Sequence, residues 1–129
     1  MGWFSNAVVG LALSVGLMIP DTISYVQPPP PTIEEKILKE LPPVFLEIAR
    51  AESQMKPTAY NPETHSGCSG SYGIFQIACL HFEGEPTFDV DTNIQLAKKV
   101  YETQGFSAWG VCRTKVKCYE WLLNSLSLY

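Results

Sequence analysis

Four consecutive prolines, Pro28–Pro31, divide the chain into two unequal parts. Proline lacks a backbone N–H and its ring clashes with the preceding helical turn, so this run cannot lie inside a helix. It favours a stiff, extended polyproline II segment. We therefore interpret residues 21–32 as a tether, with a plain loop as the alternative. The working domain is expected over residues 33–129, because the chain is long enough for one domain and too short for two.

The first twenty residues contain no charged side chain. Their apolar centre, Ala7 to Ile19, is about as long as the core of a signal peptide and short for a membrane span. No lysine or arginine precedes it, and no A-x-A cleavage site follows it. Residues 1–20 are therefore interpreted as a signal peptide or a membrane anchor, and a buried N-terminal helix is the third reading. Either of the first two predicts an exported protein of the cell envelope or extracellular space.

The chain contains four cysteines, namely Cys68, Cys79, Cys112 and Cys118. They are expected to form disulfides if the chain is exported, and three ways of pairing them are open. No C-x-x-C pair is present, so a zinc ribbon or thioredoxin-type site is not expected. His65 and His81 have no metal-ligand spacing and are interpreted as incidental loop or surface residues. No metal and no cofactor are predicted.

The domain is predicted to be mainly α. Thr32, with Glu35 three residues later, forms a capping box ahead of an apolar helical face over residues 33–41. Two prolines at 42–43 end this helix and start the next, over residues 43–55. Further along we expect a long loop or loop-rich lobe over residues 56–73, followed by a short helix or strand over residues 74–82. A helix is predicted over residues 91–105, with Asp91 and Gly105 as its caps. A turn over residues 106–112 and a final helix over residues 115–129 complete the domain.

Glu52 lies at the end of the apolar face of the second helix, because steps of three and four residues from Phe45 and Ile48 reach it. A carboxylate at such an edge loses hydration, which disfavours its charged form and raises its pKa. A general acid for glycosidic cleavage needs a raised pKa near neutral pH. A solvated surface charge is the alternative from this position alone.

Three segments together carry a family resemblance: "IARAES" ending in Glu52–Ser53, "GSYGIFQI" at residues 70–77, and "NIQLAKKVYETQGFSAWGVC" at 93–112. The first two, with "AYNP" between them, resemble the soluble lytic transglycosylase group of the lysozyme-like superfamily. The third is similar to the closing segment of the resuscitation-promoting-factor relatives in that superfamily. The resemblance covers about residues 44–112.

This resemblance implies a small, mostly helical lysozyme-like domain, here a lytic transglycosylase domain, with a groove that binds a glycan strand. It implies cleavage of the β-1,4 bond between N-acetylmuramic acid and N-acetylglucosamine in peptidoglycan. Glu52 is then the single acid/base, and the product carries a 1,6-anhydro-N-acetylmuramic acid end.

Supporting roles follow from the same motifs. Gln76 is expected to bind substrate or position Glu52, and Ser71 and Tyr72 are expected to line the groove. Tyr60 and Trp109 are candidates for stacking on sugar faces, with the hydrophobic core as the alternative for Trp109.

The chain departs from the resuscitation-factor relatives at Ala51, where they carry a cysteine paired with the one after the tryptophan. Cys112 therefore cannot form that bridge. The sequence-local pairs, Cys68–Cys79 and Cys112–Cys118, are the alternatives.

Other functions stay open. A hydrolytic lysozyme needs a second carboxylate, for which Glu63 or Asp89 is available, although Glu63 is more typical of a surface charge. A non-catalytic glycan-binding module and a structural or assembly protein of an envelope or virion are further alternatives. The formal net charge of −4 argues against a nucleic-acid partner. We expect a monomer whose partner is the peptidoglycan strand.

Overall fold

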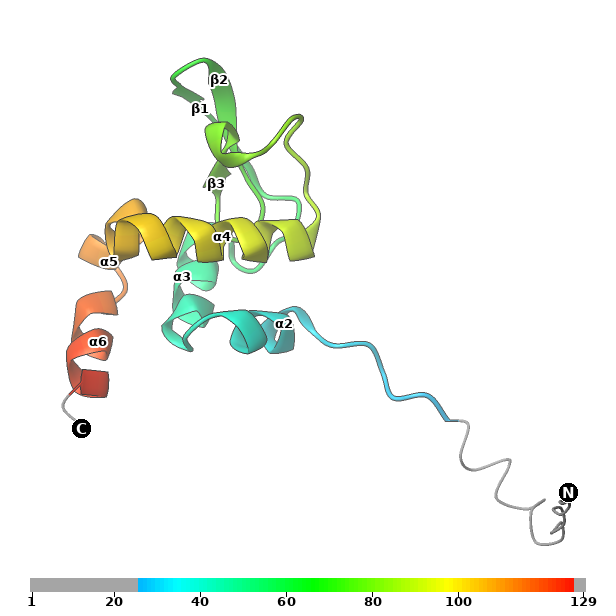
Figure 1. The fold of residues 1–129 in the computed structure, drawn as a ribbon, viewed down its shortest axis with the longest axis vertical. Coiled ribbons are helices and arrows are strands. Elements are labelled where there is room, and N and C mark those ends of the chain that lie inside the picture. The colour runs from blue at the N-terminus through cyan, green and yellow to red at the C-terminus, as the bar shows by residue number, and fades with distance from the viewer. Residues whose placement is uncertain (1–25, 127–129) are drawn as a thin grey trace, which may run out of the picture. The chain divides into compact units, whose positions relative to one another are not determined.

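The computed structural model describes residues 26–126, and the compact unit begins at Pro31. It is mainly helical with a small antiparallel sheet, and α4 runs between that sheet and α2 (Figure 1). Residues 26–32 of the predicted tether belong to no helix or strand. The predicted leader over residues 1–20 lies outside the described residues. Within residues 26–126, no helix is both long and apolar enough to pass through a bilayer.

Helix α2, Ile33–Glu40, begins at the predicted capping box. The Thr32 hydroxyl accepts from the Glu35 backbone N–H at 3.1 Å, and the Glu35 carboxylate accepts from the Thr32 backbone N–H at 2.8 Å. Helix α3 follows the two prolines and covers Val44–Ser53. It stops because Gln54 takes a left-handed conformation, with φ of 57°. Glu52 therefore lies in the last turn of α3.

The loop-rich segment predicted over residues 56–73 is instead largely a β-hairpin. Strand β1, Tyr60–His65, pairs with β2, Cys68–Tyr72, and β2 pairs with the short β3, Ile77–Ala78. The strands were missed because β1 is almost wholly exposed and carries Asn, Pro, Glu and Thr rather than alternating apolar residues. The segment over 74–82 contains a turn, β3 and the 3-10 helix η2, Cys79–His81.

Helix α4, Val90–Gln104, ends at Gly105 as predicted, but its N-cap is Asp89 rather than Asp91. The Asp89 carboxylate accepts from the Thr92 backbone N–H at 2.9 Å, because a capping side chain reaches the amide three residues on. Hydrogen bonds from the Thr92 amide and hydroxyl lower the pKa of Asp89. Asp91 lies in the first turn and forms an ion pair with Lys36 at 3.2 Å.

The C-terminal part is more helical than the predicted turn over 106–112. It contains the 3-10 helix η3, Gly105–Ala108, the short helix α5, Val111–Thr114, and the final helix α6, Cys118–Leu126. The core gathers around Phe45, whose ring is fully buried. Four rings from three later segments contact it at centroid distances between 5.1 and 5.9 Å: Phe75, Tyr101, Phe106 and Trp109.

The structure pairs Cys68 with Cys79 and Cys112 with Cys118, which is the sequence-local arrangement. The first pair joins β2 to η2, and the second joins α5 to α6.

Removing the second disulfide by Cys112→Ala with Cys118→Ala is expected to lower the free energy of unfolding by about 2 kcal/mol, since a short closed loop removes little chain entropy from the unfolded state. Urea unfolding under oxidising conditions measures this loss. Dithiothreitol should lower the midpoint of the wild type by more than that of the double variant, which retains one bridge. An unchanged midpoint in the double variant would contradict the expected contribution.

Candidate active site

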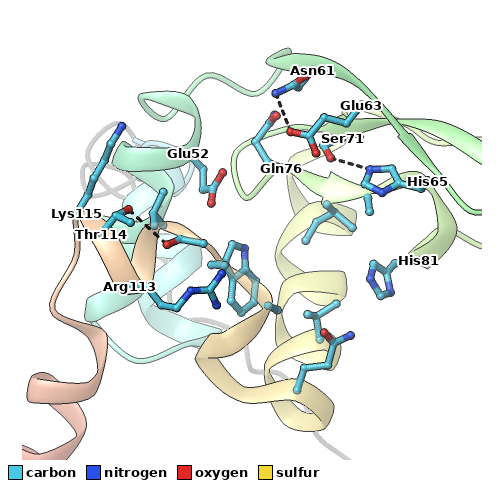
Figure 2. Close-up of a pocket in the computed structure, with 18 residues that line it drawn as sticks. Glu52, Asn61, Glu63, His65, Ser71, Gln76, His81, Arg113, Thr114 and Lys115 are labelled. Carbon is cyan, nitrogen blue, oxygen red and sulfur yellow. Dashed lines mark hydrogen bonds between the residues drawn. The ribbon is translucent and has the colours of Figure 1, made fainter.

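A pocket of about 640 Å³ opens beside the last turn of α3 (Figure 2). Its walls come from segments far apart in the sequence, namely the end of α3, the hairpin, α4 and the α5 segment. The pocket brings together five side chains predicted from the sequence: Glu52, Glu63, Ser71, Gln76 and Trp109. A second depression of about 550 Å³ adjoins it and shares Glu52, Asn61 and Gln76. Glu52 therefore lies where the two depressions meet.

The environment of Glu52 favours its protonated form. The side chain is partly buried, and this burial raises the pKa of the Glu52 carboxyl, which is the direction predicted from its place on the helix. The negative charge of Glu63 raises the pKa of Glu52 further, and the positive charge of Lys115 opposes both effects. A carboxyl that keeps its proton to higher pH can act as a general acid.

Ser53 fixes the end of α3 behind this carboxyl. Its buried hydroxyl lies 2.8 Å from the Ile74 carbonyl oxygen and 3.1 Å from the Ala49 carbonyl oxygen, and its single proton is shared between these two acceptors. The contact with Ile74 ties the last helical turn to the turn that precedes β3. The last turn of α3, which carries Glu52, is thus tied to the segment whose residues Gln76 to Ala78 line the pocket.

Asn93 anchors that turn from the other side, and sequence reasoning missed it. Its side chain is 1% exposed, accepts from the Phe75 amide at 2.9 Å and donates to the Tyr72 carbonyl at 2.7 Å. Gly73 has a φ of +80°, and a Cβ there would lie 2.3 Å from Asn93 Nδ2, so only glycine fits. The available signal was spacing, since Asn93 shares the buried face of its helix with Ala97 and Val100.

Gln76 lines both depressions, but its side-chain nitrogen is used in hydrogen bonds that stabilise the turn before β3. Nε2 donates to the carbonyls of Ala59, at 3.2 Å, and Gly73, at 3.0 Å. Within residues 26–126 no hydrogen bond joins Gln76 to Glu52, so the predicted positioning role is not supported by a direct contact. In a hydrogen bond between Gln76 and a substrate, the side-chain carbonyl oxygen of Gln76 would accept from a substrate hydroxyl or N–H group.

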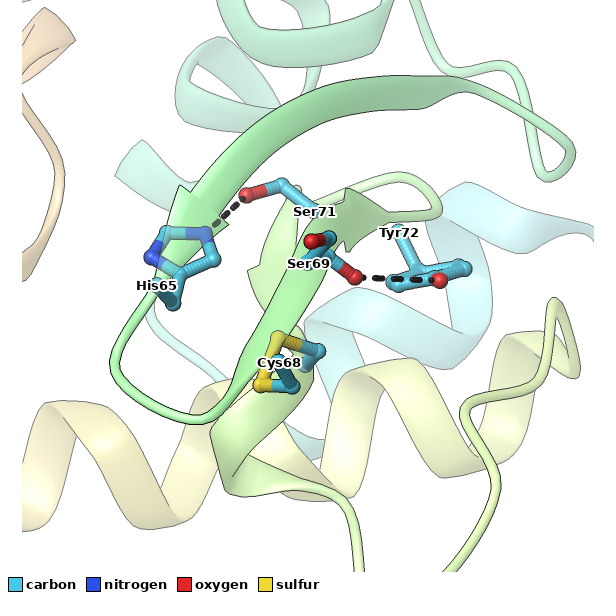
Figure 3. The surroundings of a disulfide bond; sticks show 6 residues. His65, Cys68, Ser69, Ser71 and Tyr72 are labelled. Carbon is cyan, nitrogen blue, oxygen red and sulfur yellow. Dashed lines mark hydrogen bonds between the residues drawn. A yellow bond between two sulfur atoms is a disulfide. The ribbon is translucent and has the colours of Figure 1, made fainter.

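Ser71 and Tyr72 are not neighbours in the pocket as predicted, because successive residues of a strand point to opposite faces. Ser71 faces the pocket, where its hydroxyl lies 3.3 Å from His65 Nε2, while the Tyr72 side chain lies on the other side of β2 (Figure 3). The Tyr72 ring packs against Tyr60, Phe82 and Phe88. Tyr72 is not among the residues that line either depression.

The two predicted stacking residues differ. Trp109 is 3% exposed, its indole N–H donates to the Phe75 carbonyl at 3.1 Å, and its ring contacts Phe45 edge-on. It belongs to the core, and little of its surface is left for a sugar although it borders the pocket. Tyr60 is 50% exposed in the second depression and stays a candidate for stacking.

Three residues for which a surface position was expected also line the pocket, and the first of them is exposed: Glu63, His65 and His81. Glu63 accepts from the Asn61 amide at 3.2 Å (Figure 2). Within the described residues, no group of three or more His, Cys, Asp or Glu side chains is arranged to hold a metal ion.

Comparison of the chain with models of protein families, with curated proteins and with solved structures gives no match.

Proposed function

We propose that this protein cleaves peptidoglycan glycan strands as a lytic transglycosylase, with Glu52 as its general acid/base. The position of Glu52 carries this proposal, because a partly buried carboxyl with a raised pKa lies where two open depressions meet. An extended polymer that fills both depressions would place one of its glycosidic bonds over that carboxyl. Polar side chains along the walls suit a sugar, which is held mainly by hydrogen bonds.

One carboxyl suffices for this reaction. Protonated Glu52 donates its proton to the glycosidic oxygen as the bond to the anomeric carbon of N-acetylmuramic acid breaks. The 2-acetamido group of that sugar stabilises the positive charge that develops. The Glu52 carboxylate then takes the proton of the sugar's 6-hydroxyl, while the oxygen of that hydroxyl forms a bond to the anomeric carbon. The product is a 1,6-anhydro sugar, no water is consumed and Glu52 is again protonated.

Mass spectrometry of digested peptidoglycan tests the proposal. Fragments with 1,6-anhydro ends, one water lighter than reducing ends, support it. Reducing ends would show hydrolysis instead, and intact peptidoglycan would overturn the proposed activity.

Hydrolysis with Glu63 as a second carboxylate is the alternative that one observation favours. Glu63 lines the same pocket and lies close enough for its charge to raise the pKa of Glu52. Asp89, the other acid considered from the sequence, is occupied as the N-cap of α4 and is not among the residues that line either depression. Glu63 alone is therefore kept for this role.

Glu63→Gln separates the two mechanisms. A transglycosylase should keep its activity, but the alkaline limb of its kcat/KM profile should move to lower pH. The reason is that removing a negative charge lowers the pKa of Glu52, so the acid loses its proton earlier as pH rises. A hydrolase should lose cleavage at every pH. Glu102→Gln, on the exposed side of α4, is the control and should leave the profile unchanged.

A further inference from the structure

Two walls of the pocket carry opposite charge. The α5 segment supplies Arg113 and Lys115, whereas β1 supplies Glu63 beside Asn61 and His65 (Figure 2). In Figure 2 the Arg113 side chain extends toward the middle of the pocket, and Lys115 stands at its edge beside the end of α3. This basic wall occurs in a chain whose formal net charge is −4. Glu52 lies between the two walls.

The cations of this wall are available to a ligand. The ion pairs within residues 26–126 join Lys36 to Asp91, Lys98 to Glu40 and Lys117 to Glu120. None of them uses Arg113 or Lys115, and both of these side chains are exposed. Lys117, two residues beyond Lys115, is not among the residues lining the pocket and has its own acidic partner at 3.7 Å.

The backbone that carries these cations is held in place. The amides of Lys115 and Val116 donate to the Val111 carbonyl at 2.9 and 2.8 Å. Val116 is buried, and the Cys112–Cys118 disulfide closes the segment. A charge on a fixed backbone loses less entropy when it binds a ligand than one on a mobile loop.

We propose that Arg113 and Lys115 bind an anionic substituent of the glycan strand, a carboxylate of an attached peptide or a phosphate. This inference rests on the proposed function. Guanidinium and ammonium groups both pair with such oxyanions, arginine through two parallel hydrogen bonds. Glu63 on the facing wall repels the same substituent. The strand therefore binds in one direction, and strands stripped of their charged substituents are poorer ligands.

Equilibrium binding to the full-length Glu52→Gln variant tests this, because binding is measured without cleavage. Three muramyl oligosaccharides of equal length serve as probes: one carries peptides, one is stripped of them and has each freed lactyl carboxyl capped as a neutral amide, and one is stripped and capped in the same way but carries a 6-phosphate. Calorimetry should show roughly tenfold tighter binding of a charged probe than of the stripped one, with the difference shrinking at high salt. The preferred probe identifies the anion.

Adding Arg113→Ala with Lys115→Ala should remove this preference, so that a charged probe loses roughly tenfold more affinity than the stripped probe does. Lys117→Ala is the matched control and should keep the preference. Equal affinity of all three probes, or equal losses for charged and stripped probes, would overturn the inference.

Failure of this inference is distinguishable from failure of the proposed function. If the wild type cleaves strands but binds all probes alike, only the inference fails. If charge-selective binding is seen and the wild type cleaves nothing, only the proposed activity fails. Absence of binding to every probe overturns both.

Discussion

Glutamine in place of Glu52 is expected to reduce glycan cleavage by roughly 10³-fold or more, because it fills the same space but cannot donate a proton to the leaving oxygen. Release of soluble fragments from purified peptidoglycan measures the loss, and circular dichroism checks that the helical fold is kept. Glu102→Gln should retain full activity. Cleavage that survives Glu52→Gln would remove Glu52 from the mechanism.

The same substitution, Glu52→Gln, should increase the stability of the fold at neutral pH although it removes activity. Because the folded-state pKa of Glu52 is raised, its stabilising contribution is present below the unfolded-state pKa and is lost as pH rises through the folded-state value. At neutral pH the folded wild type therefore holds a poorly hydrated charge, which glutamine lacks. Urea unfolding should show the Glu52→Gln variant to be the more stable protein at neutral pH, with a smaller difference in acid. A less stable variant at neutral pH would contradict the burial argument.

Asn93→Ala is expected to lower the free energy of unfolding by about 3 kcal/mol, because it leaves the Phe75 amide and the Tyr72 carbonyl without their partners. Urea unfolding measures this loss. Activity should fall as well, since the freed turn carries Gln76 and receives the Ser53 hydroxyl.

Asn61→Ala is the matched control for this loss. The Asn61 side chain is exposed, and its one hydrogen bond within the described residues goes to the Glu63 side chain, so its removal should change stability by less than about 0.5 kcal/mol. Equal unfolding midpoints for Asn93→Ala and the wild type would show that the turn does not depend on this anchor.

The features predicted correctly from the sequence are those decided locally. The capping box at Thr32 depends on residues three apart, and the end of α4 depends on Gly105. The direction of the pKa shift of Glu52 followed from helical periodicity, because burial is its largest cause and the apolar stripe of α3 shows which side of the helix packs against the rest of the domain. The mainly helical class followed from the same local patterns.

The features that were missed depend on contacts between distant segments. The hairpin has no apolar alternation to reveal it, because β1 is almost wholly exposed. Without the strand, nothing indicated that Ser71 and Tyr72 point to opposite sides. Glu63 on β1 and Lys115 beyond α5 line the same pocket although they are about fifty residues apart, and no periodicity records this.

The alternation along β2 has a consequence for how this hairpin can evolve. Ser71 and Asn61 face each other across the strands and both line the pocket, and the next pair, Tyr72 and Tyr60, pack their rings against each other at an interplanar angle of 60°. Shifting the register by one residue would bring a phenol ring to the pocket and a hydroxyl to the aromatic cluster. The insertion or deletion of one residue in β2 would therefore exchange its two faces at once.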